Sequence, residues 1–185
     1  MIIERFILAL GLLLCLSCSA SSWPDKYDYQ IIKATKQFMP GVDWRLYKAQ
    51  LAQESALRPD AVSPAGAKGI AQFMPATWQE VSDQLSLAGT PFEPHLAIPA
   101  GAYYMSKLRS GWNWQRPEQD KYNLALASYN AGFGNLLKAQ KRCNNAILYV
   151  DIIDCLPDIT KHHANETINY VISIRRYHLI IKANE

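Results

Sequence analysis

The stretch LAQESALRPDAVSPAGAKGIAQFMPATW, residues 51–78, decides how this chain is interpreted. It places Glu54 at the end of an apolar helical pattern and follows it with a segment rich in Pro, Gly, Ala and Ser. The breakers between Arg58 and Gly69 predict a loop, and Pro75 stands where a new helix can begin. The sequence therefore predicts a helix that ends beside Glu54 and a loop that returns toward it.

The pattern before Glu54 places its carboxyl on an apolar helical face. Asp43 is a plausible N-cap, and offsets of three, seven and ten keep on one face the side chains of Trp44, Tyr47, Leu51 and Glu54. Burial of that face would disfavour the ionised carboxylate and raise its pKa, which is the property of a general acid. Spacing alone leaves a second interpretation open, in which Glu54 is a solvated surface residue.

The remainder of the chain has helical periodicity between short connections. Helices are predicted over Asp25 to Phe38, Ala76 to Leu85, Leu96 to Leu108, Lys121 to Gly132, Leu136 to Arg142 and Asn165 to Ala183. Pro99 should lie in the first turn of its helix or kink it, and Asn165 is the expected N-cap of the last one. No stretch alternates like a strand with hairpin signals. We predict a mostly α fold with one domain.

The first twenty residues have the composition of a leader. An apolar run from Phe6 to Leu16 is followed by small residues near Ala20, which predicts a signal peptide over 1–20 and a mature domain over 21–185. An uncleaved N-terminal anchor is the alternative. Lipidation of Cys18 is disfavoured because Cys15 stands where such signals carry an aliphatic residue. Either way we expect export to the cell envelope, and most simply to the periplasm.

The mature chain then keeps two cysteines, Cys143 and Cys155, which in an oxidising compartment predict one disulfide across a loop. Two buried free thiols are the alternative, because spacing does not establish that the Cα atoms approach. His162 and His163 are adjacent, but no third ligand lies at helical spacing, so no metal or organic cofactor is predicted. The formal charge of +3 comes without a dense basic run, and no nucleic-acid partner is predicted.

Four motifs occur in the order and spacing of one known family: ES at Glu54, GIAQFMP from Gly69, ASYNAG from Ala127 and ETINYV from Glu166. Together they resemble the soluble lytic transglycosylase family over roughly residues 30–180. The resemblance implies a lysozyme-like, mostly α fold. It implies a glycan substrate, the strands of bacterial peptidoglycan, cut between N-acetylmuramic acid and N-acetylglucosamine.

The resemblance also assigns roles to individual residues. Glu54 aligns with the catalytic acid, and a tyrosine hydroxyl from Tyr129 is expected to reach its carboxyl. Substrate-binding or supporting positions are Ser55, Gln72, Met74, Tyr129, Asn130 and Glu166. Ser55 either closes the helix or holds the loop or the carboxyl, and Glu166 either favours a first helical turn or supports the site. Two departures from the family's usual motifs, Ala71 and Ser128, leave the reaction intact and bear on subsite preference.

In the implied mechanism a single carboxyl is both acid and base, and the C6 hydroxyl of the muramic acid closes a 1,6-anhydro ring without water. Most glycosidases use two carboxylates. Asp60 and Glu166 are the candidates for a second one, with a turn residue as the simpler interpretation of Asp60. Rival functions are a lysozyme-type hydrolase and a non-catalytic glycan-binding or envelope-assembly component, and assembly partners are possible but not derivable from the sequence.

Overall fold

The computed structural model describes residues 23–184, and the predicted signal peptide lies outside them. The described chain is mostly helical. Its elements are η1 (Asp25–Tyr27), α1 (Asp28–Phe38), α2 (Trp44–Ser55), α3 (Pro75–Leu85), α4 (Pro94–Gly111), α5 (Glu118–Ala131), α6 (Phe133–Arg142), α7 (Tyr149–Ile153), α8 (Leu156–Thr160), η2 (Lys161–His163) and α9 (Ala164–Ala183). Only isolated bridges occur among the described residues, in the loop after α2. The predicted mostly α fold is confirmed.

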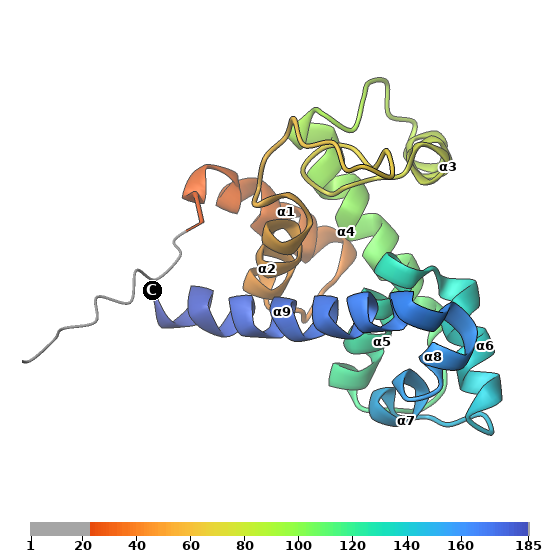
Figure 1. The fold of residues 1–185 in the computed structure, drawn as a ribbon. Helices are drawn as coiled ribbons and strands as arrows, with labels where there is room; N and C mark the ends of the chain where they lie inside the picture. The colour runs from red at the N-terminus through yellow and green to blue at the C-terminus, as the bar shows by residue number, and fades with distance from the viewer. Residues whose placement is uncertain (1–22, 185) are drawn as a thin grey trace, which may run out of the picture.

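Helices α2 and α9 form the centre of the molecule, and α9 runs across α2 in Figure 1. Asp43 caps α2 as predicted, because its carboxylate accepts a hydrogen bond from the backbone N–H of Arg45. The helix ends at Ser55 because Ala56 and Leu57 both adopt left-handed backbone angles. This early end leaves Glu54 in the last turn, at the point where the chain leaves the helix.

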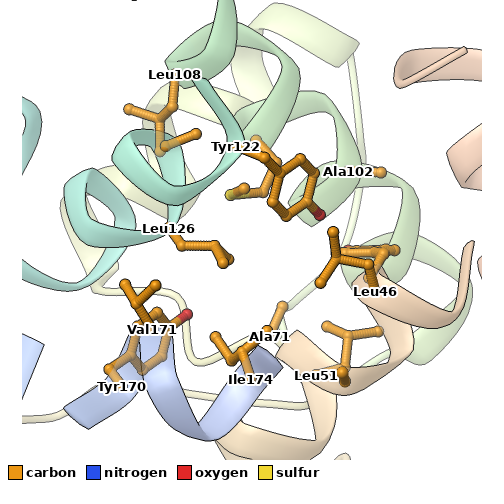
Figure 2. Close-up of a cluster of buried hydrophobic side chains, with 14 of the residues drawn as sticks. Leu46, Leu51, Ala71, Ala102, Leu108, Tyr122, Leu126, Tyr170, Val171 and Ile174 are labelled. Carbon is orange, nitrogen blue, oxygen red and sulfur yellow. The ribbon is translucent and has the colours of Figure 1, made fainter. Parts of the chain in front are cut away.

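The core fills the space between α2, α4, α5 and α9, and Figure 2 shows side chains from all four helices converging there. Leu51 from α2, Leu126 from α5 and Ile174 from α9 are each almost completely buried. The hydroxyl of Tyr47 donates to the carbonyl of Ile98 at 2.6 Å and so ties α2 to α4. The core thus fixes the helix that carries Glu54 against three neighbours.

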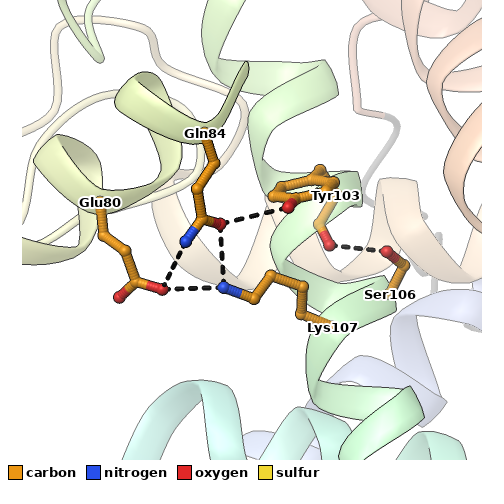
Figure 3. A network of polar contacts seen from close by, with 5 residues as sticks. All are labelled: Glu80, Gln84, Tyr103, Ser106 and Lys107. Carbon is orange, nitrogen blue, oxygen red and sulfur yellow. Dashed lines mark hydrogen bonds and ion pairs between the residues drawn. The ribbon is translucent and has the colours of Figure 1, made fainter. Parts of the chain in front are cut away.

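Helix α3 leaves the main body and is joined to α4 by polar contacts (Figure 3). Lys107 donates to Glu80 at 2.8 Å and to Gln84 at 2.9 Å, and Tyr103 also donates to Gln84. These exposed contacts add little stability individually. They join the middle and the end of α3 to α4.

A disulfide joins Cys143, at the end of α6, to Cys155, at the start of α8, with the Cα atoms 5.9 Å apart. The prediction of a loop between these cysteines was incomplete, because the segment includes the short helix α7. That helix forms because Ile152 and Ile153 are buried in the core, a tertiary gain that a five-residue periodicity does not reveal.

One further helix prediction was wrong, and one of the two alternatives for Pro99 is excluded. Asn165 does not cap α9, because the turn η2 leads directly into a helix that begins at Ala164, and Asn165 lies within its first turn. Pro99 lies beyond the first turn, since α4 begins at Pro94. None of the helices within residues 23–184 has the length and apolar character needed to cross a bilayer.

Candidate active site

Glu54 is presented by the last turn of α2 and faces the loop that follows. Ser55, the next residue, is buried, and its hydroxyl donates to the carbonyl of Ile70 at 2.8 Å. This contact fastens the returning loop to the end of α2. Of the roles considered for Ser55, the geometry gives it helix closure and loop attachment together, with no hydrogen bond to the carboxyl.

The loop itself is held in a conformation that its residues specify. Gly69 has a φ of +77°, and a Cβ atom there would lie 1.8 Å from the carbonyl oxygen of Pro91, so only glycine fits. Gln72 also has a positive φ, and its side-chain amide donates to the carbonyls of Gly69 at 2.8 Å and Ala61 at 3.2 Å. The amide nitrogen of Gln72 therefore stabilises the loop that forms one wall of the site.

The hydroxyl that bonds the Glu54 carboxyl belongs to Tyr170, which donates to Oε1 across a sequence separation of 116 residues. The expected contact from Tyr129 is wrong as a hydrogen bond, because the Tyr129 hydroxyl donates to the carbonyl of Ala71 at 2.7 Å. Tyr129 is still close enough to interact electrostatically with Glu54. The two tyrosines have separate tasks: Tyr170 contacts the carboxyl and Tyr129 braces the loop.

Burial dominates the ionisation of Glu54. Removal of the carboxyl from water raises its pKa to about 8, and the hydrogen bond from Tyr170 lowers it by a smaller amount. Its electrostatic neighbours are the hydroxyls of Tyr47, Tyr129 and Tyr170, which are neutral at physiological pH. Glu54 therefore keeps its proton near neutral pH. Glu54 is half-buried on α2, so the interpretation of Glu54 as a fully solvated surface residue is wrong.

A groove of about 570 Å³ opens in front of Glu54. One wall is the loop after α2 and the other is α9, with the end of α5 between them. Its lining residues are Gln53, Glu54, Ser63, Ala65, Ala67, Gln72, Met74, Tyr129, Asn130, Glu166, Asn169, Tyr170 and Ser173. Every site residue predicted from the sequence lies on this groove except Ser55, which is buried behind it.

The two candidate second carboxylates are placed differently. Glu166 lines the groove, is largely exposed, and lies 3.8 Å from the imidazole of His163. Asp60 is exposed and outside the groove lining. Asn130 also lines the groove, and its side-chain oxygen accepts a hydrogen bond from Thr167 at 2.7 Å. That contact joins the end of α5 to the start of α9, where Glu166 stands.

Sequence reasoning missed Tyr170, although the residue belongs to the ETINYV motif that carries the resemblance. It also missed Gln53, Asn169 and Ser173 on the groove walls. A helical count could have found the three on α9, since 166, 169, 170 and 173 fall on one face of that helix. Trp78 and Trp112 are buried in the core, whereas Trp114 is half exposed.

Nothing in the described range assembles a typical metal ligand set. Within residues 23–184, no group of three or more His, Cys, Asp or Glu side chains could hold an ion together. The rings of His162 and His163 pack on each other with centroids 4.0 Å apart. The polar groups on the groove are therefore the carboxyl of Glu54, the exposed carboxylate of Glu166, and several amides and hydroxyls. Such groups suit a polar, uncharged ligand.

The protein is therefore a lysozyme-like helical domain, in which a glutamate at the end of a helix keeps its proton. Residues 30–149 match the family model described as "Transglycosylase SLT domain", and the chain belongs to that family. The predicted family and lysozyme-like fold are confirmed.

Named relatives agree with this assignment. The chain is 30% identical over 158 residues to the membrane-bound lytic murein transglycosylase F of Shewanella pealeana, and 32% identical over 158 residues to that of Photobacterium profundum. Each match covers 77% of this chain but only 32% and 30% of the respective relative. The chain thus spans about a third of the length of these curated relatives.

Solved structures give the same fold. The lytic transglycosylase Slt of Pseudomonas aeruginosa matches with a TM-score of 0.69 and 30% identity, over 88% of this chain and 25% of that one. The 70 kDa soluble lytic transglycosylase of Escherichia coli matches with a TM-score of 0.64 and 25% identity, over 85% of this chain and 24% of that one. Both are much longer chains, of which this domain resembles one part.

Proposed function

We propose that this domain is a peptidoglycan lytic transglycosylase, which cleaves the β-1,4 bond between N-acetylmuramic acid and N-acetylglucosamine without water and leaves 1,6-anhydro ends. The observation that carries the proposal is the state of Glu54: a carboxyl on a polar groove whose burial raises its pKa to about 8. A protonated acid at neutral pH can donate to a glycosidic oxygen. Membership of the family supports the choice of substrate.

In the proposed reaction, Glu54 transfers its proton to the glycosidic oxygen as the bond to the anomeric carbon breaks, and N-acetylglucosamine leaves with a free hydroxyl. The carboxylate so formed then removes the proton from the C6 hydroxyl of the same muramic acid. That oxygen attacks the anomeric carbon and closes the anhydro ring, and Glu54 is protonated again. The substrate's own N-acetyl group is the expected support for the developing positive charge.

The surrounding residues would bind and orient the glycan. Tyr170 contacts the carboxyl directly and favours the carboxylate formed halfway through the reaction. Gln72 and Met74 belong to the loop wall, and Asn130 and Glu166 to the opposite side of the groove. We propose these four as substrate-binding positions, with Ser55 and Tyr129 as residues that hold the loop wall in place.

Mass spectrometry of the products tests the proposal. Purified sacculi incubated with the protein should release muropeptides that end in 1,6-anhydro-muramic acid, each one water lighter than a hydrolysed reducing end. The Glu54→Gln variant is the matched control and should release none. Exclusively reducing ends would replace the proposal with a lysozyme-type hydrolase, for which exposed Glu166 on the same groove is the candidate base. Binding without any release would indicate a glycan-binding module.

Two further proposals concern the location of the protein and the extent of its mature domain. We propose export to the cell envelope, where peptidoglycan is found, with residues 21–185 as the mature domain. The curated relatives named above are called membrane-bound, which fits an envelope location. Fractionation of cells that express the full chain, together with the mass of the exported protein, would test both points.

A further inference from the structure

A second pocket, which we call the side pocket, lies next to the groove beyond Asn130 and Glu166. Its volume is about 360 Å³, and it shares those two residues with the groove. Its other lining residues are Ala131, Asn135, Ile159, Thr160, His163 and Thr167. The groove and the side pocket therefore form one continuous surface. The part of this surface beyond Glu166 has no role in the reaction described above.

The walls of the side pocket are held together covalently. Asn135 belongs to α6 and Thr160 to α8, and these two helices lie beside the start of α9 in Figure 1. The disulfide between Cys143 and Cys155 joins the end of α6 to the residue before α8. The two walls are thus fixed relative to each other before any ligand binds.

The side pocket begins close to the acid. Glu166 lies on α9 one helical turn before Tyr170, a distance of about 6 Å along the helix axis, and the hydroxyl of Tyr170 contacts Glu54. An extended peptide of three residues spans up to about 10 Å. A short peptide attached to a sugar at Glu54 can therefore reach the side pocket.

Most of the hydrogen-bonding capacity left on the side pocket accepts rather than donates. The hydroxyl of Thr160 donates to a backbone carbonyl of its own helix at 3.3 Å, and that of Thr167 donates to Oδ1 of Asn130 at 2.7 Å. The amide nitrogen of Asn135 donates to a backbone carbonyl at the end of α5 at 2.8 Å. A hydroxyl has one proton and an amide oxygen has none, so the two hydroxyls and Oδ1 of Asn135 are left as acceptors.

The charge on the two linings is negative. Among the described residues, no lysine or arginine lines the groove or the side pocket, although the whole chain has a formal charge of +3. Glu54 keeps its proton near neutral pH, which leaves the carboxylate of Glu166. Within residues 23–184 its ion-pair partner is the imidazole of His163, at 3.8 Å, which is charged only when protonated. An uncharged glycan does not require this carboxylate.

We propose that the side pocket binds a primary ammonium group at the end of an aliphatic chain, as carried by the diamino acid of a peptidoglycan stem peptide, and that Glu166 and Asn135 select it. An ammonium group has three N–H donors and a positive charge, which complement these acceptors and the carboxylate. Ile159 and Ala131 provide apolar surface for the methylene groups.

The chemistry of the substrate connects this pocket with the groove. The muramic acid of peptidoglycan carries the stem peptide on its lactyl group, so a muramic acid held at Glu54 brings its own peptide to the side pocket. The inference rests on the proposed function, because it names a further part of the same substrate.

Binding of muramyl peptides tests the inference without turnover. The probes are N-acetylmuramyl-L-alanyl-γ-D-glutamyl-L-lysine amide and its Nε-acetyl form, which lacks the charge. In nitrogen-15 NMR titrations, the lysine form should shift backbone amide signals of residues 159–167. It should bind about 3- to 5-fold more tightly than the acetylated form, the range expected for an exposed ion pair.

Three variants assign this preference to the side pocket. Glu166→Gln keeps the shape of the side chain without its charge and should bind both peptides equally. Asn135→Leu alters the side pocket outside the groove lining and should reduce the preference about 2-fold. The matched control is Asp154→Asn, which removes an exposed carboxyl outside both linings and should keep the full preference. Circular dichroism would establish that each variant is folded.

The same preference should appear in turnover. Sacculi with free amino groups should be cleaved with a kcat/KM about 3- to 5-fold higher than sacculi whose amino groups have been acetylated. Glu166→Gln should cleave both at the same rate. Because one variant is compared on two substrates, a general loss of turnover in Glu166→Gln cancels in the ratio.

Three results would overturn the inference: equal binding of the two peptides by the wild-type protein, a preference that persists in folded Glu166→Gln, or shifts of residues 159–167 by a glucosamine disaccharide but not by the muramyl peptide. The third would assign the ammonium group to a deacetylated sugar. Failure of the proposed function gives a different result, namely no anhydro products from either kind of sacculi. The NMR comparison remains informative in that case because it needs no cleavage.

Discussion

Two ionisable side chains of α2, Lys48 and Glu54, have opposite electrostatic surroundings. Lys48 is 3% exposed, and its ammonium lies 2.9 Å from Asp25 and 2.7 Å from Asp28. Glu54 faces three tyrosine hydroxyls, and no cation among residues 23–184 contributes to its pKa. The charge of Lys48 is compensated by carboxylates. Glu54 instead stays uncharged near neutral pH because its carboxyl keeps its proton.

The difference separates stability from chemistry within one helix. The carboxylates at Lys48 belong to η1 and α1, so this ion pair holds the first described helices against α2. Replacement of Lys48 alone would remove the cation from both carboxylates, and loss of one partner of an ion pair that holds a buried charge destabilises the fold. The uncompensated site of Glu54 contributes nothing comparable to folding and instead supplies a proton near neutral pH. Substitution of Lys48 should therefore lower stability and spare turnover, whereas substitution of Glu54 should lower turnover without a loss of stability.

The largest expected effect is on turnover. Glu54→Gln removes the transferable proton and keeps the shape of the side chain, so turnover on sacculi should fall at least about 10²–10⁴-fold. Release of soluble muropeptides from labelled sacculi measures it. The control is Asp154→Asn, which removes an exposed carboxyl outside the groove. Near wild-type turnover of Glu54→Gln would show that Glu54 does not supply the proton for the reaction.

The second effect is on stability. Lys48→Met removes the cation from beside Asp25 and Asp28 and should reduce the free energy of unfolding by about 1–2 kcal/mol, less than for a fully buried pair, because Asp25 is exposed and Asp28 is partly exposed. Urea unfolding followed by circular dichroism measures this change. Turnover per folded molecule should remain close to that of the wild type. A stability change below about 0.5 kcal/mol would show that the ion pair does not anchor α1.

The third expected effect is a mutation that increases stability, whereas most mutations decrease it. Burial raises the pKa of Glu54 from 4.5 to about 8, so the folded state holds its proton more tightly than the unfolded chain. Stability from this group therefore falls as pH rises from about 4.5 to about 8 and is constant above that range. Glu54→Gln should remove this loss and be more stable than the wild type at pH 8, by an amount below about 5 kcal/mol because the side chain is partly solvated.

Thermal unfolding at pH 4.5, 6 and 8 would measure this difference in stability between Glu54→Gln and the wild type. The difference in Tm between Glu54→Gln and the wild type should be smallest at pH 4.5 and should grow toward pH 8. A difference that does not depend on pH would mean that Glu54 titrates near its ordinary value in the folded protein.

Local patterns were sufficient for much of this architecture. The cap at Asp43, the end of α2 near Ser55 and the breakers of the loop are properties of neighbouring residues, and each prediction agreed with the structure. The apolar face that carries Tyr47 and Leu51 also led to the expectation of a buried Glu54. These features depend on residues within a few turns of one another.

Contacts between distant segments could not be predicted in this way. The assignment of a hydroxyl to Glu54 failed because Tyr129 and Tyr170 both lie in recognised motifs, and only the packing of α9 on α2 decides which one reaches the carboxyl. Helix α7 was missed because five residues carry no clear period, and its formation depends on burial of Ile152 and Ile153. The role of Lys48 likewise depends on partners far away in the sequence.

The smallest expected effect separates the two tyrosines. Tyr129→Phe removes a hydroxyl that braces the carbonyl of Ala71, so it should cost about 1 kcal/mol of stability, reduce turnover by less than about 10-fold and leave the pKa of Glu54 near 8. Tyr170→Phe removes the hydrogen bond that lowers that pKa, so the alkaline limb of its pH–rate profile should move upward. The pH profiles of the two variants provide the measurement. The opposite result, in which Tyr129→Phe moves the alkaline limb and Tyr170→Phe does not, would favour the expectation drawn from the motifs. It would mean that Tyr129, and not Tyr170, contacts the carboxyl of Glu54 in the working enzyme. The carboxyl would then have to exchange its tyrosine partner when the glycan binds.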